Sequence, residues 1–222
     1  MEPFAESSPI LAETIPATTK NFDINPANGG TPARASIMTG LLPHNHGVTT
    51  VTHTVDEDQS NLRREKEHWA QRLKEDGYNT AYFGKWHVER SNKLEEFGWD
   101  TYALIDGVST EYINANKKHK DSIDKMQPHL FIDNPPGYKT TPFYGVSNIP
   151  TEERVLGLVS NKAKKFLNEE KDDKPWACFV SVIEPHDPFI SSKKFYDMYE
   201  NIELKLPKSF NDDFKDKPNI YK

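Results

Sequence analysis

The sequence has few of the features that build a disulfide scaffold or a nucleic-acid surface. It contains one cysteine, Cys178, so neither a disulfide framework nor a cysteine-based zinc site can form within the chain. Acidic residues outnumber basic ones and the net charge is -6, which argues against binding through phosphate neutralisation or a polybasic membrane contact. Because Cys178 stands in an apolar run, it predicts a packed, inert thiol.

Long apolar runs are also missing. No stretch approaches the roughly 20 apolar residues of a membrane-spanning helix. Residues 1–17 lack a basic region followed by an apolar run, so no signal peptide is visible. We therefore expect neither a membrane nor a nucleic acid as partner, and a cytoplasmic or periplasmic location. Hydrophobic residues make up a low 35% of the chain, but clustered aromatic residues still allow a globular core.

Helix and strand patterns alternate along the chain. Apolar residues at helical spacing predict helices over residues 61–76 and 151–167. A short helix is predicted over residues 31–40, because Pro32 suits a first helical turn and Gly40 can end it. Short apolar runs predict strands over residues 80–83 and 176–183, and the second is expected to be buried on both faces. Such alternation favours an α/β fold.

Two stretches predict little regular structure. Residues 1–29 are rich in Pro, Ser, Thr, Ala and Asn, which indicates an irregular N-terminal segment. Residues 101–150 hold many Asn, Lys, Pro and Gly and are expected to form a long loop excursion, which is uncommon unless it is functional.

The first segment that carries chemistry is TPARASIMTG, residues 31–40. Gly30, just before it, stands at a predicted helix N-terminus, where backbone N–H groups favour an anion. Arg34 would add a bidentate partner for an oxyanion. A capped helix with a surface arginine explains this segment equally well when it is taken alone.

The second segment is GYNTAYFGKWH, residues 77–87. Lys85 and His87 follow a predicted strand, and ligands of open α/β sheets bind at the carboxyl ends of strands. Alternation along an extended chain puts Lys85 and His87 on one side and Trp86 on the other. A cation and an imidazole at one point suit an oxyanion and a proton transfer. The alternative is an exposed lysine beside a satisfied histidine.

The third segment is EPHDPF, residues 184–189, at the end of the apolar run 176–183. His186 is held between two prolines, and a rigid histidine at a strand end suits general acid catalysis. The alternative is a structural loop histidine.

Together and in this order, the segments resemble the sulfatase family. That family carries Cys or Ser, then x-Pro-x-Arg and a short run ending in Thr-Gly, and residues 31–40 match everything after the nucleophile. Its second signature, Gly-Tyr-x-Thr running into Gly-Lys-Trp-His, is matched by residues 77–87. The Pro-His-Asp-Pro-Phe segment and Gly98-Trp99-Asp100 are also typical. The resemblance runs from about residue 30 to the C-terminus and is thin within 101–150.

The resemblance implies an α/β fold with a mixed, mostly parallel sheet between helices, similar to alkaline phosphatase. Residues 1–222 would form part of the catalytic domain. The implied reaction is hydrolysis of a sulfate monoester by covalent catalysis. The partner would be a small-molecule or glycan sulfate ester, and carbohydrate, aryl and choline sulfates all remain open.

The resemblance also implies roles for individual residues. Position 30, Gly30 here, would be formylglycine, acting as nucleophile and as a ligand of a calcium ion that polarises the sulfate. Arg34 would orient it and offset its charge. Lys85 would hold a sulfate oxygen, His87 would assist at the nucleophile, and His186 would bind substrate near the leaving oxygen and donate a proton.

One further histidine, His46, follows the first motif. It fits a structural role in capping the loop better than a catalytic role.

Two departures from the family pattern stand out. Gly30 occupies the place of Cys or Ser, which leaves three explanations: formylglycine written as Gly, an inactivating substitution, or a natural loss. The aspartate pair and the late Asp with Asn or His that complete the family's calcium site are not visible, so segments are expected to be missing at both ends.

Three other interpretations compete. One is a phosphonate or phosphate ester hydrolase of the same superfamily, which uses the same motif. Another is a non-catalytic binder of sulfated ligands, with Gly30 a true glycine. The third is a truncated product that folds poorly.

Overall fold

The computed structural model describes residues 30–105, 114–115, 117–118, 129–132, 141–169 and 174–218 of the 222. The chain divides into two compact units. The first unit comprises Met1–Thr110 and Val159–Val182, and the second comprises Glu111–Leu158 and Ile183–Lys222. The expectation of an irregular segment over residues 1–29 lies outside the described residues.

A parallel sheet forms the centre of the first unit. Its strands β1 (Asn79–Gly84), β2 (Thr101–Leu104) and β5 (Trp176–Ser181) are arranged in the order β2-β1-β5. Both pairings are parallel, and the last residue of β1, Gly84, pairs with the last residue of each neighbour. The three carboxyl ends therefore lie in one row. The strand expected over residues 80–83 and the α/β fold are both confirmed.

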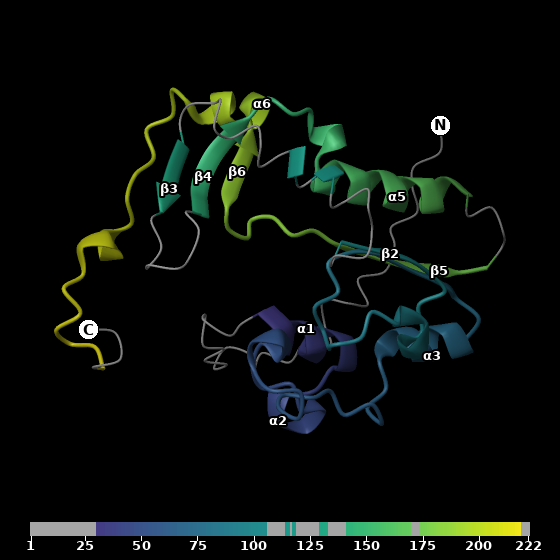
Figure 1. The fold of residues 1–222 in the computed structure, drawn as a ribbon. Helices are drawn as coiled ribbons and strands as arrows, with labels where there is room; N and C mark the ends of the chain where they lie inside the picture. The colour runs from purple at the N-terminus through teal and green to yellow at the C-terminus, as the bar shows by residue number, and fades with distance from the viewer. Residues whose placement is uncertain are drawn as a thin grey trace. The chain divides into compact units, whose positions relative to one another are not determined.

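Helices pack on both sides of this sheet (Figure 1). On β1, Tyr82 turns to one side, where its ring lies 5.2 Å from Trp86 and 5.2 Å from Trp99. Phe83 turns to the other side, 6.1 Å from Phe166 of α5. The helices are α1 (Gly30–Thr39), α2 (Pro43–His46), α3 (Trp69–Glu75) and α5 (Val155–Glu169), with 3-10 turns at Thr52–Thr54, Leu94–Phe97 and Thr151–Glu153.

Two of the three helix predictions hold closely. The helix expected over residues 31–40 is α1, which ends before Gly40 at a φ of +69°. The helix expected over residues 151–167 is α5, and the apolar face that its spacing predicts is buried. That face comprises Val155, Val159, Ala163 and Phe166.

The helix expected over residues 61–76 is confirmed only in its second half, because α3 begins at Trp69. The preceding stretch is tied to other parts of the unit. The backbone N–H of Arg63 donates to the carbonyl of His46 at 2.9 Å, and the Arg64 guanidinium pairs with Glu96. These long-range contacts replace the local hydrogen bonds that a helix would need.

The prediction that residues 176–183 are buried on both faces is wrong. Among the described residues β5 pairs with β1 alone, and Trp176 and Val180 keep 50% and 45% of their surface exposed. Cys178 is half-buried, and burial raises the pKa of its thiol, so it stays protonated and inert as expected.

The second unit carries a mixed sheet, in which β3 (His129–Ile132), β4 (Thr141–Ser147) and β6 (Phe189–Ser192) lie side by side (Figure 1). The β3–β4 pair is antiparallel and the β4–β6 pair is parallel. A short helix, α6 (Lys193–Tyr196), follows. Little regular structure was expected over residues 101–150, yet β2, β3 and β4 lie within this range. Most of residues 106–140 lie outside the described residues, so the expected excursion as a whole stays a prediction.

A neutral histidine sits in the core of the first unit. His68 is fully buried, and its ring stacks on Phe97 at 4.6 Å between centroids. Among the described residues, neither ring nitrogen has a hydrogen-bond partner. Burial, with a smaller contribution from His46, lowers the pKa of His68 to about 4. The apolar surroundings therefore keep this imidazole uncharged at neutral pH.

This arrangement makes the stability of the unit depend on pH. The folded-state pKa of His68 lies below its unfolded value, so protonation favours unfolding; the stabilisation is complete above about pH 6.5 and declines as the pH falls to about 4. We expect the free energy of unfolding to fall by about 3 kcal/mol over this pH range because of His68. In urea melts between pH 7.5 and 4, His68→Phe should remove that part of the pH dependence, and the exposed-site control His44→Phe should not. If the free energy of unfolding changed equally with pH in His68→Phe and in the unsubstituted protein, this role of His68 would be contradicted.

Candidate active site

Arg34 joins the start of α1 to the carboxyl ends of two strands. Its Nη1 donates to the carbonyl of Lys85 at 3.0 Å and to the hydroxyl of Ser181 at 2.5 Å. Arg34 lies four residues, about one helical turn, after Gly30 on the same helix, so the contact also fixes where that helix begins. The first and second sequence motifs therefore meet at one edge of the sheet.

The backbone of Lys85 is held from several directions. Its N–H donates to the carbonyl of Ser181 at 2.8 Å, and its own carbonyl accepts from Arg34 and from the Tyr82 hydroxyl, the latter at 2.5 Å. Lys85 itself is partly buried. The strand ends at Gly84, whose φ is +110°. A Cβ at Gly84 would lie 1.9 Å from the Ser181 carbonyl oxygen, so this close approach requires glycine.

Position 30 has room for a side chain. Gly30 opens α1 and is exposed. A Cβ built there would meet the His87 ring at ordinary contact distances, 3.7 Å from Nδ1 and 3.9 Å from Cε1. Within the described part of the chain, the geometry thus accommodates Cys, Ser or a modified residue at this position, and His87 is the side chain that faces it.

His87 contacts a histidine that the sequence motifs did not single out. Its Nε2 lies 2.8 Å from Nδ1 of His53, and the two rings are 4.6 Å apart at 29°. The backbone of His87 has a φ of +50°, which is unusual for a residue with a side chain. Trp86 is fully buried, whereas Lys85 and His87 are partly exposed, which agrees with the predicted separation of Trp86. That Lys85 and His87 share one side stays a prediction, since the backbone at His87 is not extended.

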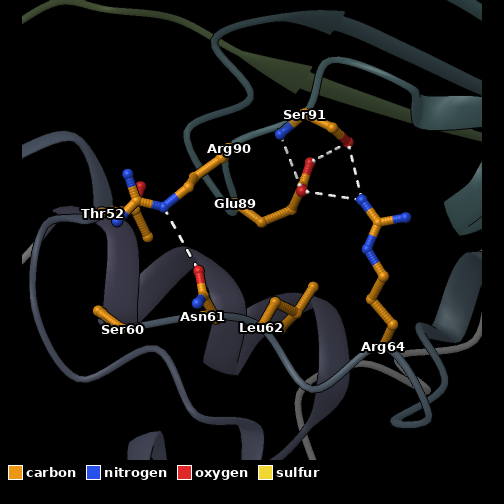
Figure 2. Close-up of a pocket in the computed structure, with 8 residues that line it drawn as sticks. All are labelled: Thr52, Ser60, Asn61, Leu62, Arg64, Glu89, Arg90 and Ser91. Carbon is orange, nitrogen blue, oxygen red and sulfur yellow. Dashed lines mark hydrogen bonds and ion pairs between the residues drawn. The ribbon is translucent and has the colours of Figure 1, made fainter. Parts of the chain in front are cut away.

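A buried carboxylate fixes the turn after His87. The side chain of Glu89 is 7% exposed and accepts from the Trp86 indole at 3.1 Å. It also accepts from the Ser91 N–H at 2.9 Å and the Ser91 hydroxyl at 2.7 Å, and it pairs with Arg64 at 3.4 Å (Figure 2). These four donors hold the Glu89 carboxylate in one orientation.

The hollow beside Glu89 lies between loops that arginine side chains hold together. It has a volume of about 390 Å³, and Arg64 and Arg90 both line it (Figure 2). Arg90 Nη2 donates to the carbonyls of Val55, Asp56 and Gln59 at 3.3, 2.6 and 3.1 Å. Because both guanidiniums already bind protein oxygens, the hollow is a poor receptor for an anion.

His46 has the structural role that the sequence favoured. It is buried, and its Nδ1 accepts from the Val48 N–H at 3.1 Å. Nε2 therefore carries the proton and donates to the Ser36 hydroxyl at 3.0 Å. Burial lowers the pKa of His46, with smaller contributions from Arg63 and His44, so the ring caps the loop in its neutral form.

His186 belongs to the second unit. Its side chain is 53% exposed, and Nδ1 lies 2.7 Å from the Asp187 carbonyl oxygen. Nearby, the buried Arg154 donates to the carbonyl of Ile190 at 2.6 Å and pairs with Glu184 at 3.6 Å. These contacts anchor both ends of the loop that carries His186, and its place in the catalytic site remains a prediction.

The described residues do not supply a calcium site by themselves. In that part of the chain no three His, Cys, Asp or Glu side chains are grouped to hold a metal ion. Over the residues that the structure describes, the neighbours of position 30 are a helix N-terminus and an imidazole, whereas calcium prefers several oxygen ligands. Over the same described ranges, no helix combines the length and apolar character that crossing a bilayer requires.

The chain is similar to sulfatases. The family profile described as Sulfatase matches residues 18–210. The choline-sulfatase of Rhizobium meliloti (strain 1021) is 30% identical over 183 residues, covering 79% of this chain and 33% of that protein. The N-acetylglucosamine-6-O-sulfatase of Bacteroides thetaiotaomicron is 23% identical over 194 residues, covering 87% and 28%. The chain thus spans a third or less of the length of these curated relatives.

Solved structures share the fold. A protein in complex with its substrate, D-glucosamine-2-N,6-O-disulfate, has a TM-score of 0.52 at 20% identity, covering 85% of this chain and 32% of that one. The phosphonate monoester hydrolase of Agrobacterium radiobacter has a TM-score of 0.51 at 19% identity, covering 76% and 34%. At these identities the likeness shows the fold alone, and it confirms the predicted α/β architecture of the alkaline phosphatase type.

Matched substitutions at two glycines test the geometry of the site. Gly30→Ser should change the free energy of unfolding by less than about 1 kcal/mol, because its Cβ meets only ordinary contacts. Gly84→Ser should cost about 3 kcal/mol or more, since φ is +110° and the Ser181 carbonyl blocks the new Cβ. Urea melts of both variants measure the difference, and similar losses at the two positions would show that the strand-end contact is wrong.

Glu89 offers a second test. Glu89→Ala should lower the free energy of unfolding by about 2–3 kcal/mol, because the buried Trp86 indole N–H loses its acceptor. Glu89→Gln keeps an acceptor oxygen and should lose less. Glu96→Ala, which removes the more exposed partner of Arg64, is the control and should lose the least. Any other order in urea melts would contradict this role for Glu89.

Proposed function

Because the chain belongs to the sulfatase family, we propose that it forms part of a catalytic domain that hydrolyses a sulfate monoester. The observation that carries this proposal is the meeting of position 30 with His87 at the edge where Arg34 ties two strand ends together. A nucleophile position, an imidazole and a helix N-terminus at one point suit covalent attack on an anionic ester.

Position 30 is proposed to carry formylglycine, the modified residue that the family resemblance implies. The geometry at Gly30 supports this proposal, because a Cβ there makes only ordinary contacts with the described residues. When present, the formylglycine hydrate supplies the oxygen that attacks sulfur. The N-terminal N–H groups of α1, an uninterrupted helix of ten residues, favour negative charge at that point.

The residues around position 30 take distinct parts in this proposal. Arg34 Nη1 donates to the Lys85 carbonyl and the Ser181 hydroxyl, and these hydrogen bonds position the start of the helix. The positive charge of Arg34 offsets the negative charge of the nucleophile. Lys85 holds a sulfate oxygen as a point charge. His87 accepts or returns the proton of the nucleophile, and His186 binds the substrate near the leaving oxygen and protonates it.

The calcium ion of the family needs oxygen ligands that the described residues do not gather at position 30. We propose Gly30, once modified, as the one ligand of this ion within the described cluster. All the chemistry assigned to Arg34, Lys85 and His87 is charge compensation, orientation or proton transfer at atoms of this chain.

The proposed substrate class is a small-molecule or glycan sulfate ester. A choline-sulfatase and an N-acetylglucosamine-6-O-sulfatase are among the relatives, and a structure of the same fold holds a sulfated glucosamine. A phosphonate or phosphate ester hydrolase is the second candidate, favoured by the fold shared with a phosphonate monoester hydrolase. If position 30 is unmodified glycine, the third candidate is a sulfated-ligand binder.

The state of position 30 decides among these functions. Mass spectrometry of the tryptic peptide Asn21–Arg34 should give a mass above the glycine form by one CO, as formylglycine requires. The same sample should hydrolyse an aryl sulfate faster than the matched aryl phosphate by roughly tenfold or more. Lys85→Ala should abolish most turnover, and the exposed-site control Lys93→Ala should leave it unchanged.

The opposite results are equally informative. A plain glycine mass would exclude the covalent route for this chain. Preference for the phosphate or phosphonate ester would favour the second candidate. Binding of a sulfated glycan without turnover, lost in Lys85→Ala, would favour the binder.

A further inference from the structure

We propose that His53 is a positioning residue for the catalytic imidazole, holding His87 in the tautomer whose Nδ1 accepts a hydrogen bond on the side of position 30. The two nitrogens that face each other are Nε2 of His87 and Nδ1 of His53, 2.8 Å apart. This inference rests on the proposed function for its effect on turnover, whereas the tautomer itself is a property of the folded chain.

A hydrogen bond between two neutral imidazoles couples their tautomers. If His87 donates from Nε2, then both rings carry their proton on Nε2; if His53 donates from Nδ1, then both carry it on Nδ1. Neutral imidazole side chains prefer the Nε2–H form, so the first arrangement satisfies both rings at once. His87 Nδ1, the ring atom closest to a Cβ at position 30, is then an acceptor.

His53 is held in place by its own loop. It belongs to the turn Thr52–Thr54, in which Thr52 is buried. At the base of this loop, the Ser60 hydroxyl accepts from the N–H groups of Thr49 and Thr50 at 3.0 and 2.9 Å and donates to the Thr50 carbonyl at 2.9 Å. These hydrogen bonds join the two ends of the loop that carries His53.

The same loop is clamped to the turn after His87. Arg90, three residues beyond His87, donates to the carbonyls of Val55, Asp56 and Gln59. His87 is held on its own side of the contact, because Glu89 accepts a hydrogen bond from the indole of the neighbouring Trp86. Since both partners are anchored by contacts independent of their own hydrogen bond, the pair is preorganised.

This arrangement has a chemical consequence at position 30. A proton acceptor facing a hydroxyl nucleophile can take its proton, whereas an N–H group at the same place can only donate to its oxygen. His53 thus determines which of these two functions His87 performs, without touching the substrate. Nothing in the motif Gly-Lys-Trp-His specifies that choice, because the motif contains only one of the two rings.

Ring nitrogen NMR of the full chain tests the proposal directly. Long-range ¹H–¹⁵N correlation spectra distinguish the two neutral tautomers, and the signals missing in His87→Gln identify His87 among the eight histidines. In the unsubstituted protein His87 should be the Nε2–H tautomer. His53→Phe keeps an aromatic ring but no acceptor and should give a mixture of tautomers. His53→Asn offers an acceptor oxygen and should restore the Nε2–H form, and His44→Phe is the matched control.

Turnover supplies the second measurement. His53→Phe should lower kcat by about tenfold with little change in KM, and His53→Asn should recover part of the loss. An Nδ1–H tautomer in the unsubstituted protein, or an unchanged tautomer in His53→Phe, would overturn the proposal. If the expected tautomers are found but no ester is hydrolysed, then the proposed function fails and the role of His53 in orienting His87 stands.

Discussion

One guanidinium nitrogen links three separate parts of the first unit. Arg34 Nη1 binds the carbonyl that follows β1 and the hydroxyl that ends β5, and it does so from the helix that opens at position 30. The contact thus joins the helix that begins at position 30 to two strand ends that the backbone already pairs. One nitrogen of the Arg34 guanidinium is thereby used to fix the geometry of the site.

The residues that belong to short, contiguous motifs were predictable from the sequence. Arg34 lies in the same helical segment as Gly30, and Lys85 and His87 come directly after a strand whose apolar pattern is clear. The parallel sheet then brings both motifs to its carboxyl edge, as the general rule for α/β folds predicts. The capping role of His46 followed from the loop chemistry around it.

Other parts of the site depend on contacts that leave no local pattern. His53 lies 34 residues before His87 in a polar stretch without a period, and Ser181 is one of many serines until the sheet register places it beside Arg34. The stretch before Trp69 has helical spacing, but tertiary contacts of Arg63 and Arg64 override its propensity. The strands within residues 101–150 were hidden by their many turn-forming residues.

The contact between Gly84 and Ser181 has a consequence for anyone who would rebuild this site elsewhere. Two main chains touch where a methyl group would collide with a carbonyl oxygen, so the distance between the strand ends is set by the backbone itself. The loop with Lys85 and His87 would therefore keep its geometry on another scaffold only if three further residues were transferred with it. These are Gly84, Ser181 of the neighbouring strand and Arg34 of the helix.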